Sequence, residues 1–103
     1  MNRIYFKMLL IIVSLLYPAF TFAASFDCGK ATVAIEKTIC GNSQLSELDS
    51  RLGEEYQKLK QSLAKESAAK LQQAQQDWLK QRLTDCSVED IQCLSHLYQQ
   101  RLQ

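Results

Sequence analysis

The chain has 103 residues, of which 47% are hydrophobic and 22% are charged, and its formal net charge at pH 7 is +1. A chain of this length predicts one small domain. The near balance of 12 basic and 11 acidic residues lacks the basic excess typical of a nucleic-acid-binding domain, so no nucleic-acid partner is expected.

Residues 1–23 have the pattern of a Sec signal peptide. Two basic residues precede an apolar run over residues 8–16, and Thr21-Phe22-Ala23 supplies small residues at the positions that a signal peptidase reads. The apolar run is shorter than the roughly 20 residues that a membrane span needs. We expect cleavage after Ala23, which leaves a domain over residues 24–103. Without the two basic residues of the leader, 10 basic residues face 11 acidic ones, a net charge near −1.

No cysteine directly follows Ala23, so no lipid or membrane anchor is expected after cleavage, and the mature protein is predicted to be periplasmic or secreted. Exported thiols meet an oxidising environment, so the four cysteines predict two disulfides. A zinc site is the alternative interpretation. The spacings C-x11-C and C-x6-C are not the close pairs typical of structural zinc, so no metal and no cofactor are expected.

The mature composition, rich in Leu, Gln, Lys, Glu and Ala and without proline, is typical of helices. A short helix is predicted over about 32–39, capped by Thr32 and followed by Gly41 in a left-handed cap. Asn42 or Ser43 then caps a second helix. Its apolar residues recur at steps of three and four and mark one buried stripe: Leu45, Leu48, Leu52, Tyr56, Leu59 and Leu63.

This stripe is not continued after Leu63, which predicts a turn near residues 64–68; a single bent helix is the alternative. The next helix carries a new stripe: Leu71, Ala74 and Trp78, with Gln75 and Arg82 beside it. Ser87 with Asp90 predicts the start of a last helix. Its expected inner face consists of Ile91, Leu94, Leu97 and Tyr98. The predicted fold is therefore an all-α, small disulfide-linked helical bundle with a central antiparallel helix pair.

The cysteine pairing follows from this arrangement. Cys28 and Cys40 flank the first helix, whose length of about 12 Å exceeds the roughly 7 Å allowed between the Cα atoms of a disulfide. A bond between Cys28 and Cys40 is therefore not expected. If the long helices form a hairpin, the start of one lies beside the end of the other. This favours Cys40–Cys86, and then Cys28–Cys93. The alternative, Cys28–Cys86 with Cys40–Cys93, stays open.

A set of short motifs lies along nearly all of residues 26–102: Asp27-Cys28, Ile35-Glu36-Lys37-Thr38-Ile39-Cys40, Leu48-Asp49, Tyr56, Gln75-x-x-Trp78-x-x-x-Arg82, Cys86, Cys93-Leu94 and Tyr98-x-x-Arg101. The combined spacing of cysteine, tryptophan and arginine residues in this set resembles the LprI-type lysozyme-inhibitor domain family. The resemblance implies a helical, disulfide-linked envelope domain, and the family name implies inhibition of lysozyme.

Structural roles are expected for most of these motif residues. Trp78 is predicted to be a core residue, and the hydroxyls of Tyr56 and Tyr98 are predicted to reach a polar rim. Arginine forks and carboxylates often fix how helices dock. Four residues are therefore predicted to form structural ion pairs rather than a catalytic cluster: Glu36, Asp49, Arg82 and Arg101. His96 is expected on the surface.

Three acidic residues, Asp85, Glu89 and Asp90, lie beside the predicted cross-link and form the candidate partner-binding patch. Acids also favour helix starts, but an acidic patch suits a cationic partner, and lysozymes are usually strongly basic. Glu54 with Glu55, and the turn near residues 65–67, are weaker candidates.

No catalytic set is recognised, so the chain is not expected to be an enzyme. The favoured function is an exported binding protein that inhibits lysozyme or a related cationic cell-wall hydrolase by occlusion. The alternative is a periplasmic immunity-type protein, or an envelope structural or stress protein, with no lysozyme target.

Overall fold

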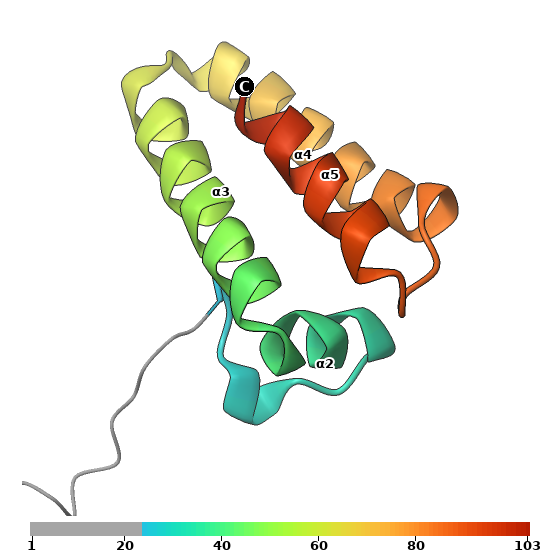
Figure 1. Ribbon diagram of the computed structural model, residues 1–103. Helices are drawn as coiled ribbons and strands as arrows, with labels where there is room; N and C mark the ends of the chain where they lie inside the picture. The colour runs from blue at the N-terminus through green and yellow to red at the C-terminus, as the bar shows by residue number, and fades with distance from the viewer. Residues whose placement is uncertain (1–23) are drawn as a thin grey trace, which may run out of the picture.

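The computed structural model describes residues 24–103, so the predicted signal peptide lies outside the described residues. The described chain forms one 3₁₀ turn, η1 (Cys28–Lys30), and four α-helices. These are α2 (Ala34–Gly41), α3 (Ser43–Ser62), α4 (Lys65–Asp85) and α5 (Ile91–Leu102) (Figure 1). Residues 24–103 contain no strand, and the predicted all-α fold is confirmed.

The start and end of α2 differ from the prediction. Its N-cap is Val33, without a side-chain hydrogen bond, so the predicted cap at Thr32 is wrong. Gly41 is the last residue of α2, and no glycine between residues 24 and 103 has a positive φ, so the left-handed cap is wrong too. The chain instead passes straight into α3 through Asn42, whose backbone is extended.

The predicted cap of α3 is confirmed at Asn42, whose Oδ1 accepts a hydrogen bond from the Leu45 N–H at 3.0 Å. The Ser46 hydroxyl donates to the Ile39 carbonyl at 2.5 Å and ties α3 to the end of α2. The apolar stripe of α3 is buried only in its first half. Leu45, Leu48 and Leu52 are buried, but Leu59 is 49% exposed.

The predicted break between α3 and α4 is confirmed, but it lies at Leu63 and Ala64, where both residues have extended backbone, and residues 65–68 of the predicted turn already belong to α4. Figure 1 shows α4 returning antiparallel to α3, and α5 running back beside them. The two long helices diverge along their length. As a result, α3 packs more extensively against α5 than against α4.

The core lies between α2, α3 and α5. Half-buried side chains, Trp78 among them, pack against it, and no residue of α4 is fully buried. Ala74, predicted on the inner stripe of α4, is exposed, and the half-buried positions are Ala68, Leu71, Gln75, Trp78, Leu79 and Arg82. The buried residues are Ala24, Ile35, Ile39, Leu45, Leu48, Leu52, Cys86, Leu94 and Tyr98.

The last helix confirms its predicted inner face, with Leu94 and Tyr98 buried and Ile91 and Leu97 packed partly against the core. The helix begins three residues later than the predicted start at Ser87: Asp90 is its N-cap, and the Asp90 carboxylate accepts a hydrogen bond from the Cys93 N–H at 3.1 Å.

The predicted disulfide pairs, Cys40–Cys86 and Cys28–Cys93, are wrong, and so is their stated alternative. The structure joins Cys28 to Cys40, with Cα atoms 5.7 Å apart, and Cys86 to Cys93, with Cα atoms 5.8 Å apart. The chain that precedes α2 includes extended residues at Ala31 and Val33. Extended residues advance about 3.3 Å each, so a few of them cover the length of α2. Cys28 therefore lies beside the end of α2 rather than beyond its start.

The error for Cys86 has a second cause. The predicted hairpin placed the end of α4 beside the start of α3. In the structure the two helices diverge, and α5 packs against α3 instead. Each disulfide therefore closes a short local loop, with sequence separations of 12 and 7 residues. Neither bond links α3 to α4.

Candidate functional site

A buried polar network joins four segments of the chain around Asp49, whose side chain is 6% exposed. Asp49 Oδ1 accepts a hydrogen bond from the Tyr98 hydroxyl at 2.6 Å. Its Oδ2 accepts two bonds from Ser25, one from the backbone N–H at 2.8 Å and one from the hydroxyl at 2.6 Å. The carboxylate thus fixes the N-terminal segment and α5 against α3.

Arg82 brings α4 into the same network. Its Nη1 donates to the Tyr98 hydroxyl at 2.6 Å and lies 4.0 Å from Asp49 Oδ1. Its guanidinium also lies 6.0 Å from the ring centre of Trp78, within cation–π range. Trp78 in turn packs edge-to-face on Tyr98, with ring centroids 5.0 Å apart. Asp49 and Arg82, two of the four residues predicted to form structural ion pairs, therefore pair with each other, and Tyr98 bridges them.

The environment of Tyr98 keeps its hydroxyl protonated. Burial raises the pKa of Tyr98 above its ordinary value, and the negative charge of Asp49 raises this pKa further, while Arg82 opposes the shift. A neutral phenol can donate to a carboxylate and accept from a guanidinium at the same time. The hydroxyl therefore serves the interior of the bundle, not the polar rim that the sequence predicted.

The remaining motif residues lie outside this network. Arg101 Nη2 donates to Gln75 Oε1 at 3.4 Å across α5 and α4. Tyr56 is half-buried on α3, with the Lys60 ammonium 5.7 Å from its ring centre. Glu36 lies in the first turn of α2, and within residues 24–103 it forms no ion pair. The predicted pairing therefore holds for two of the four charged residues, and Arg101 meets an amide instead of an acid.

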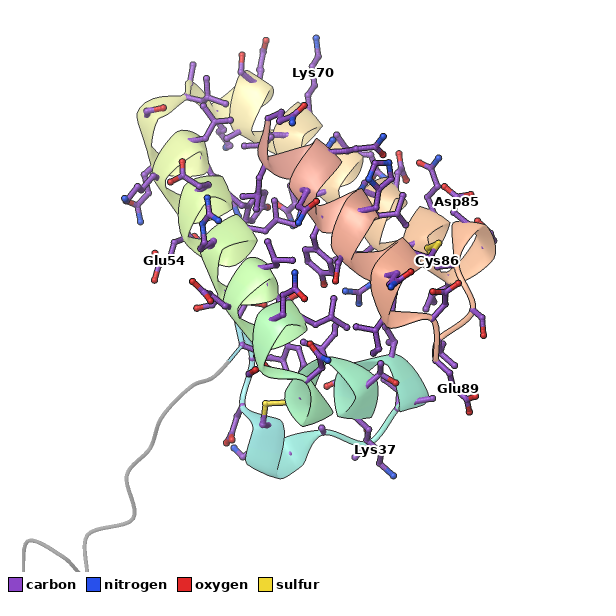
Figure 2. The ribbon with its side chains drawn as sticks, in the orientation of Figure 1. Lys37, Glu54, Lys70, Asp85, Cys86 and Glu89 are labelled. Carbon is purple, nitrogen blue, oxygen red and sulfur yellow. A yellow bond between two sulfur atoms is a disulfide. The ribbon has the colours of Figure 1, made fainter. Side chains whose placement is uncertain are left out.

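The candidate acidic patch, Asp85, Glu89 and Asp90, is exposed and surrounds the Cys86–Cys93 disulfide. Figure 2 shows Asp85 and Glu89 on either side of Cys86, at the end of the bundle far from Lys70. Asp90 also caps α5, which uses one of its carboxylate oxygens. The disulfide closes the loop that carries Glu89 and Asp90, and Asp85 ends α4 directly before it, so the three carboxylates are displayed on a constrained backbone.

Charge is separated along the bundle. We call residues 27–47 and 85–93 the disulfide end, and residues 55–71 with 99–103, around the α3–α4 turn, the hairpin end. The disulfide end has six acidic residues against Lys30 and Lys37: Asp27, Glu36, Glu47, Asp85, Glu89 and Asp90. The hairpin end has five basic residues against Glu55 and Glu66: Lys58, Lys60, Lys65, Lys70 and Arg101. The disulfide end therefore has an excess of four negative charges, and the hairpin end has an excess of three positive charges.

Other predicted candidates are scattered over the surface. Glu54 and Glu55 are exposed on α3, and Figure 2 shows Glu54 on the side of α3 away from α5. His96 is exposed on α5. Among residues 24–103, no three His, Cys, Asp or Glu side chains gather closely enough to hold a metal ion. In the same range, no helix is both long and apolar enough to cross a bilayer.

Sequence reasoning missed the contact between Ser25 and Gly53. A Cβ atom built on Gly53 would lie 2.7 Å from the Ser25 Cβ, closer than two such atoms can approach. Glycine in the middle of a helix costs about 0.5–1 kcal/mol relative to alanine, and Gly53 lies near the centre of the 20-residue α3. This glycine was the available signal that another segment approaches the helix.

Gly53→Ala is therefore expected to destabilise the domain despite the better helix propensity of alanine, because the N-terminal segment must move and the Ser25–Asp49 bonds break. Gly41→Ala is the matched control, since a Cβ at Gly41 meets nothing within 4 Å. Urea unfolding measures both free energies, and hydrogen exchange at the Ser25 amide reports on the contact. An unchanged stability of Gly53→Ala with a protected Ser25 amide would show that the contact is unimportant.

Comparisons with known proteins agree with this architecture. The family described as "Lysozyme inhibitor LprI" matches residues 28–103. The chain is similar to the proteins named Lipoprotein LprI of Mycobacterium tuberculosis (strains CDC 1551 and H37Rv) and of Mycobacterium bovis, each 35% identical over 85 residues. The similarity covers 80% of this chain but 41% of each relative, so the chain spans less than half of their length. No solved structure matches the chain.

The matched region includes both disulfides and all four helices. It also contains the Asp49–Tyr98–Arg82 network, apart from its contact with Ser25. On the strength of this match and of the 35% identity, the chain belongs to the LprI lysozyme-inhibitor family.

Proposed function

We propose that the chain is an exported inhibitor of lysozyme or of another basic cell-wall hydrolase, and that its disulfide end contacts the enzyme. The observation that carries this proposal is the acidic patch, in which Glu89 and Asp90 lie on the loop closed by the Cys86–Cys93 bond and Asp85 directly precedes it. Charge complementarity steers the encounter of two proteins and suppresses wrong partners. The family description adds that proteins of this kind are named inhibitors rather than catalysts.

Inhibition would work by occlusion. Glycoside hydrolases of this kind cleave the glycan between two carboxyl groups in a cleft, and a protein seated over that cleft excludes the substrate. A constrained loop loses little conformational freedom on binding, which favours affinity. The excess of four negative charges at the disulfide end would attract a cationic enzyme and orient the inhibitor with its hairpin end away from the contact.

Export is part of the proposal. Ala24 is buried and Ser25 is bonded to Asp49, so the folded domain includes the residues that directly follow the predicted cleavage site. N-terminal sequencing of the protein recovered from the periplasm or the medium should begin at Ala24. A chain that keeps residues 1–23, or that stays in the cytoplasm, would contradict export.

A lysis assay tests the target and the surface together. The purified protein is expected to slow lysozyme on a cell-wall suspension, and the inhibition should weaken as salt is added, because salt screens exposed charges. The variant Asp85→Asn/Glu89→Gln/Asp90→Asn is expected to weaken inhibition at least about tenfold, which corresponds to about 1.4 kcal/mol. Asparagine is as good an N-cap as aspartate, so α5 should keep its start.

Glu54→Gln/Glu66→Gln/Asp77→Asn is the control, since it also removes three exposed acids but none from the disulfide end. Equal weakening by the control would show that only net charge matters and that the patch is not the contact surface. Failure of the wild-type protein to inhibit several lysozymes at large molar excess would overturn the inhibitor proposal itself.

A further inference from the structure

An apolar groove of about 600 Å³ opens at the hairpin end, between α3, α4 and α5. Its apolar lining comes from all three helices: Leu52, Tyr56, Leu59, Leu71 and Leu102. A second hollow of about 580 Å³ shares Leu52, Tyr56, Lys58 and Gln75 with it, but most of the residues that line this hollow have polar side chains and only two of them are leucines. The first groove is therefore the one suited to an apolar ligand.

The groove exists because the stripe of α3 continues beyond the point where the other helices cover it. Leu52 is 7% exposed, but Leu59, two turns later, is 49% exposed. The positions of α4 that face α3 include Gln75, and α3 and α4 diverge, so the core does not close here. Exposed apolar side chains gathered in one groove mark an interaction site more often than scattered ones do.

Positive charge lines the same groove. Arg101 is exposed at the end of α5, and its hydrogen-bonding partner is the neutral side chain of Gln75, at 3.4 Å. The ion pair within residues 24–103 joins Arg82 to Asp49, so the Arg101 guanidinium is not neutralised by a carboxylate. Lys58 and Glu55 also line the groove and largely offset each other. The remaining charge therefore favours a ligand with a negative group beside its apolar part.

We propose that this groove binds an anionic amphiphile with a single acyl chain, a fatty-acid-like molecule whose chain lies among the leucines and whose acid group meets Arg101. Small-molecule sites are concave, mostly apolar, about 300–1,000 Å³ in volume and equipped with a few polar groups. The groove matches this description at about 600 Å³. The site lies at the opposite end of the bundle from the acidic patch and does not depend on the inhibitor function.

Calorimetric titration with dodecanoate, below its micellar concentration, tests the proposal. Dodecanoate is expected to bind at one site, and dodecyltrimethylammonium, which has the same chain length and a positive head, at least tenfold more weakly. Arg101→Gln is expected to weaken dodecanoate binding about tenfold and to abolish most of the preference for the negative head. Lys80→Gln, an exposed cation outside the groove, should have no effect.

Leu59 and Leu83 form a matched pair for the apolar part, because they are 49% and 50% exposed and only Leu59 lines the groove. Leu59→Ala should weaken dodecanoate binding several-fold, and Leu83→Ala should leave it unchanged. Equal binding of the two amphiphiles, or equal losses in the two leucine variants, would indicate unspecific partition and overturn the proposal. Absence of any dodecanoate binding would also overturn it, and would leave an acidic protein segment as the occupant to test next.

Discussion

Asp49→Asn is expected to lower the free energy of unfolding by about 3–5 kcal/mol, the usual cost of removing one partner from a buried ion pair. Asp49 accepts three hydrogen bonds, from Tyr98 and twice from Ser25. An asparagine amide has one accepting oxygen, so it can replace only one of the two carboxylate oxygens. Its NH₂ group would then face the donors of either Tyr98 or Ser25. The Arg82 guanidinium, whose side chain is 11% exposed, would also lose its counter-charge.

This loss would be a large fraction of the stability of so small a domain, since natural domains are stable by only about 5–15 kcal/mol. Urea unfolding followed by far-ultraviolet circular dichroism measures it. Asp77→Asn is the control, because Asp77 is exposed and bonds only to Gln73 on its own helix, at 3.0 Å. The control should change stability by no more than about 0.5 kcal/mol. A loss below about 1 kcal/mol in Asp49→Asn would mean that the network does not hold the helices together.

Removal of the Cys28–Cys40 bond, by serine at both positions, is expected to cost about 3 kcal/mol. Closing a loop of this length restricts the unfolded chain by about that amount, and the loop here spans 12 residues. The bond also holds the N-terminal segment near α2, and this segment includes Ser25, which donates hydrogen bonds to Asp49. Urea unfolding should therefore show a lower stability, and the Ser25 amide should exchange faster.

Tryptic digestion without reduction tests the pairing directly. Cleavage after Lys30, Lys37 and Arg51 places Cys28 and Cys40 in different peptides, whereas one peptide, residues 83–101, holds both Cys86 and Cys93. The structure predicts that peptide 24–30 is linked to peptide 38–51 and that peptide 83–101 carries an internal bond. A single species joining all three peptides would instead show bonds between the two halves of the bundle, and would contradict the structure.

The local disulfides change which interactions hold the fold together. Because neither bond links α3 to α4, the arrangement of the long helices rests on packing and on the Asp49–Tyr98–Arg82 network. The bonds instead constrain two local segments, residues 28–40 and residues 86–93. The candidate acidic patch lies at the second of these segments.

Several local features were predictable because their signals lie within a few residues of each other. The cap at Asn42 follows from a side chain that accepts a bond from the next turn. The break at Leu63 follows from the end of a stripe with helical period. The inner face of α5, with Leu94 and Tyr98 buried, follows from the same spacing.

The sequence by itself determined an all-helical domain, the position of its main turn and its membership of the family, because helix periodicity, caps and motif spacing are local patterns. Only the tertiary structure decided which cysteines pair, that Tyr98 bridges Asp49 and Arg82, that Ser25 rests on Gly53 and that a groove stays open at the hairpin end. The physical reason is that these contacts depend on how far α3 and α4 diverge and on where α5 packs. Asp49 and Tyr98 are separated by 49 residues, and no spacing rule reaches across that distance.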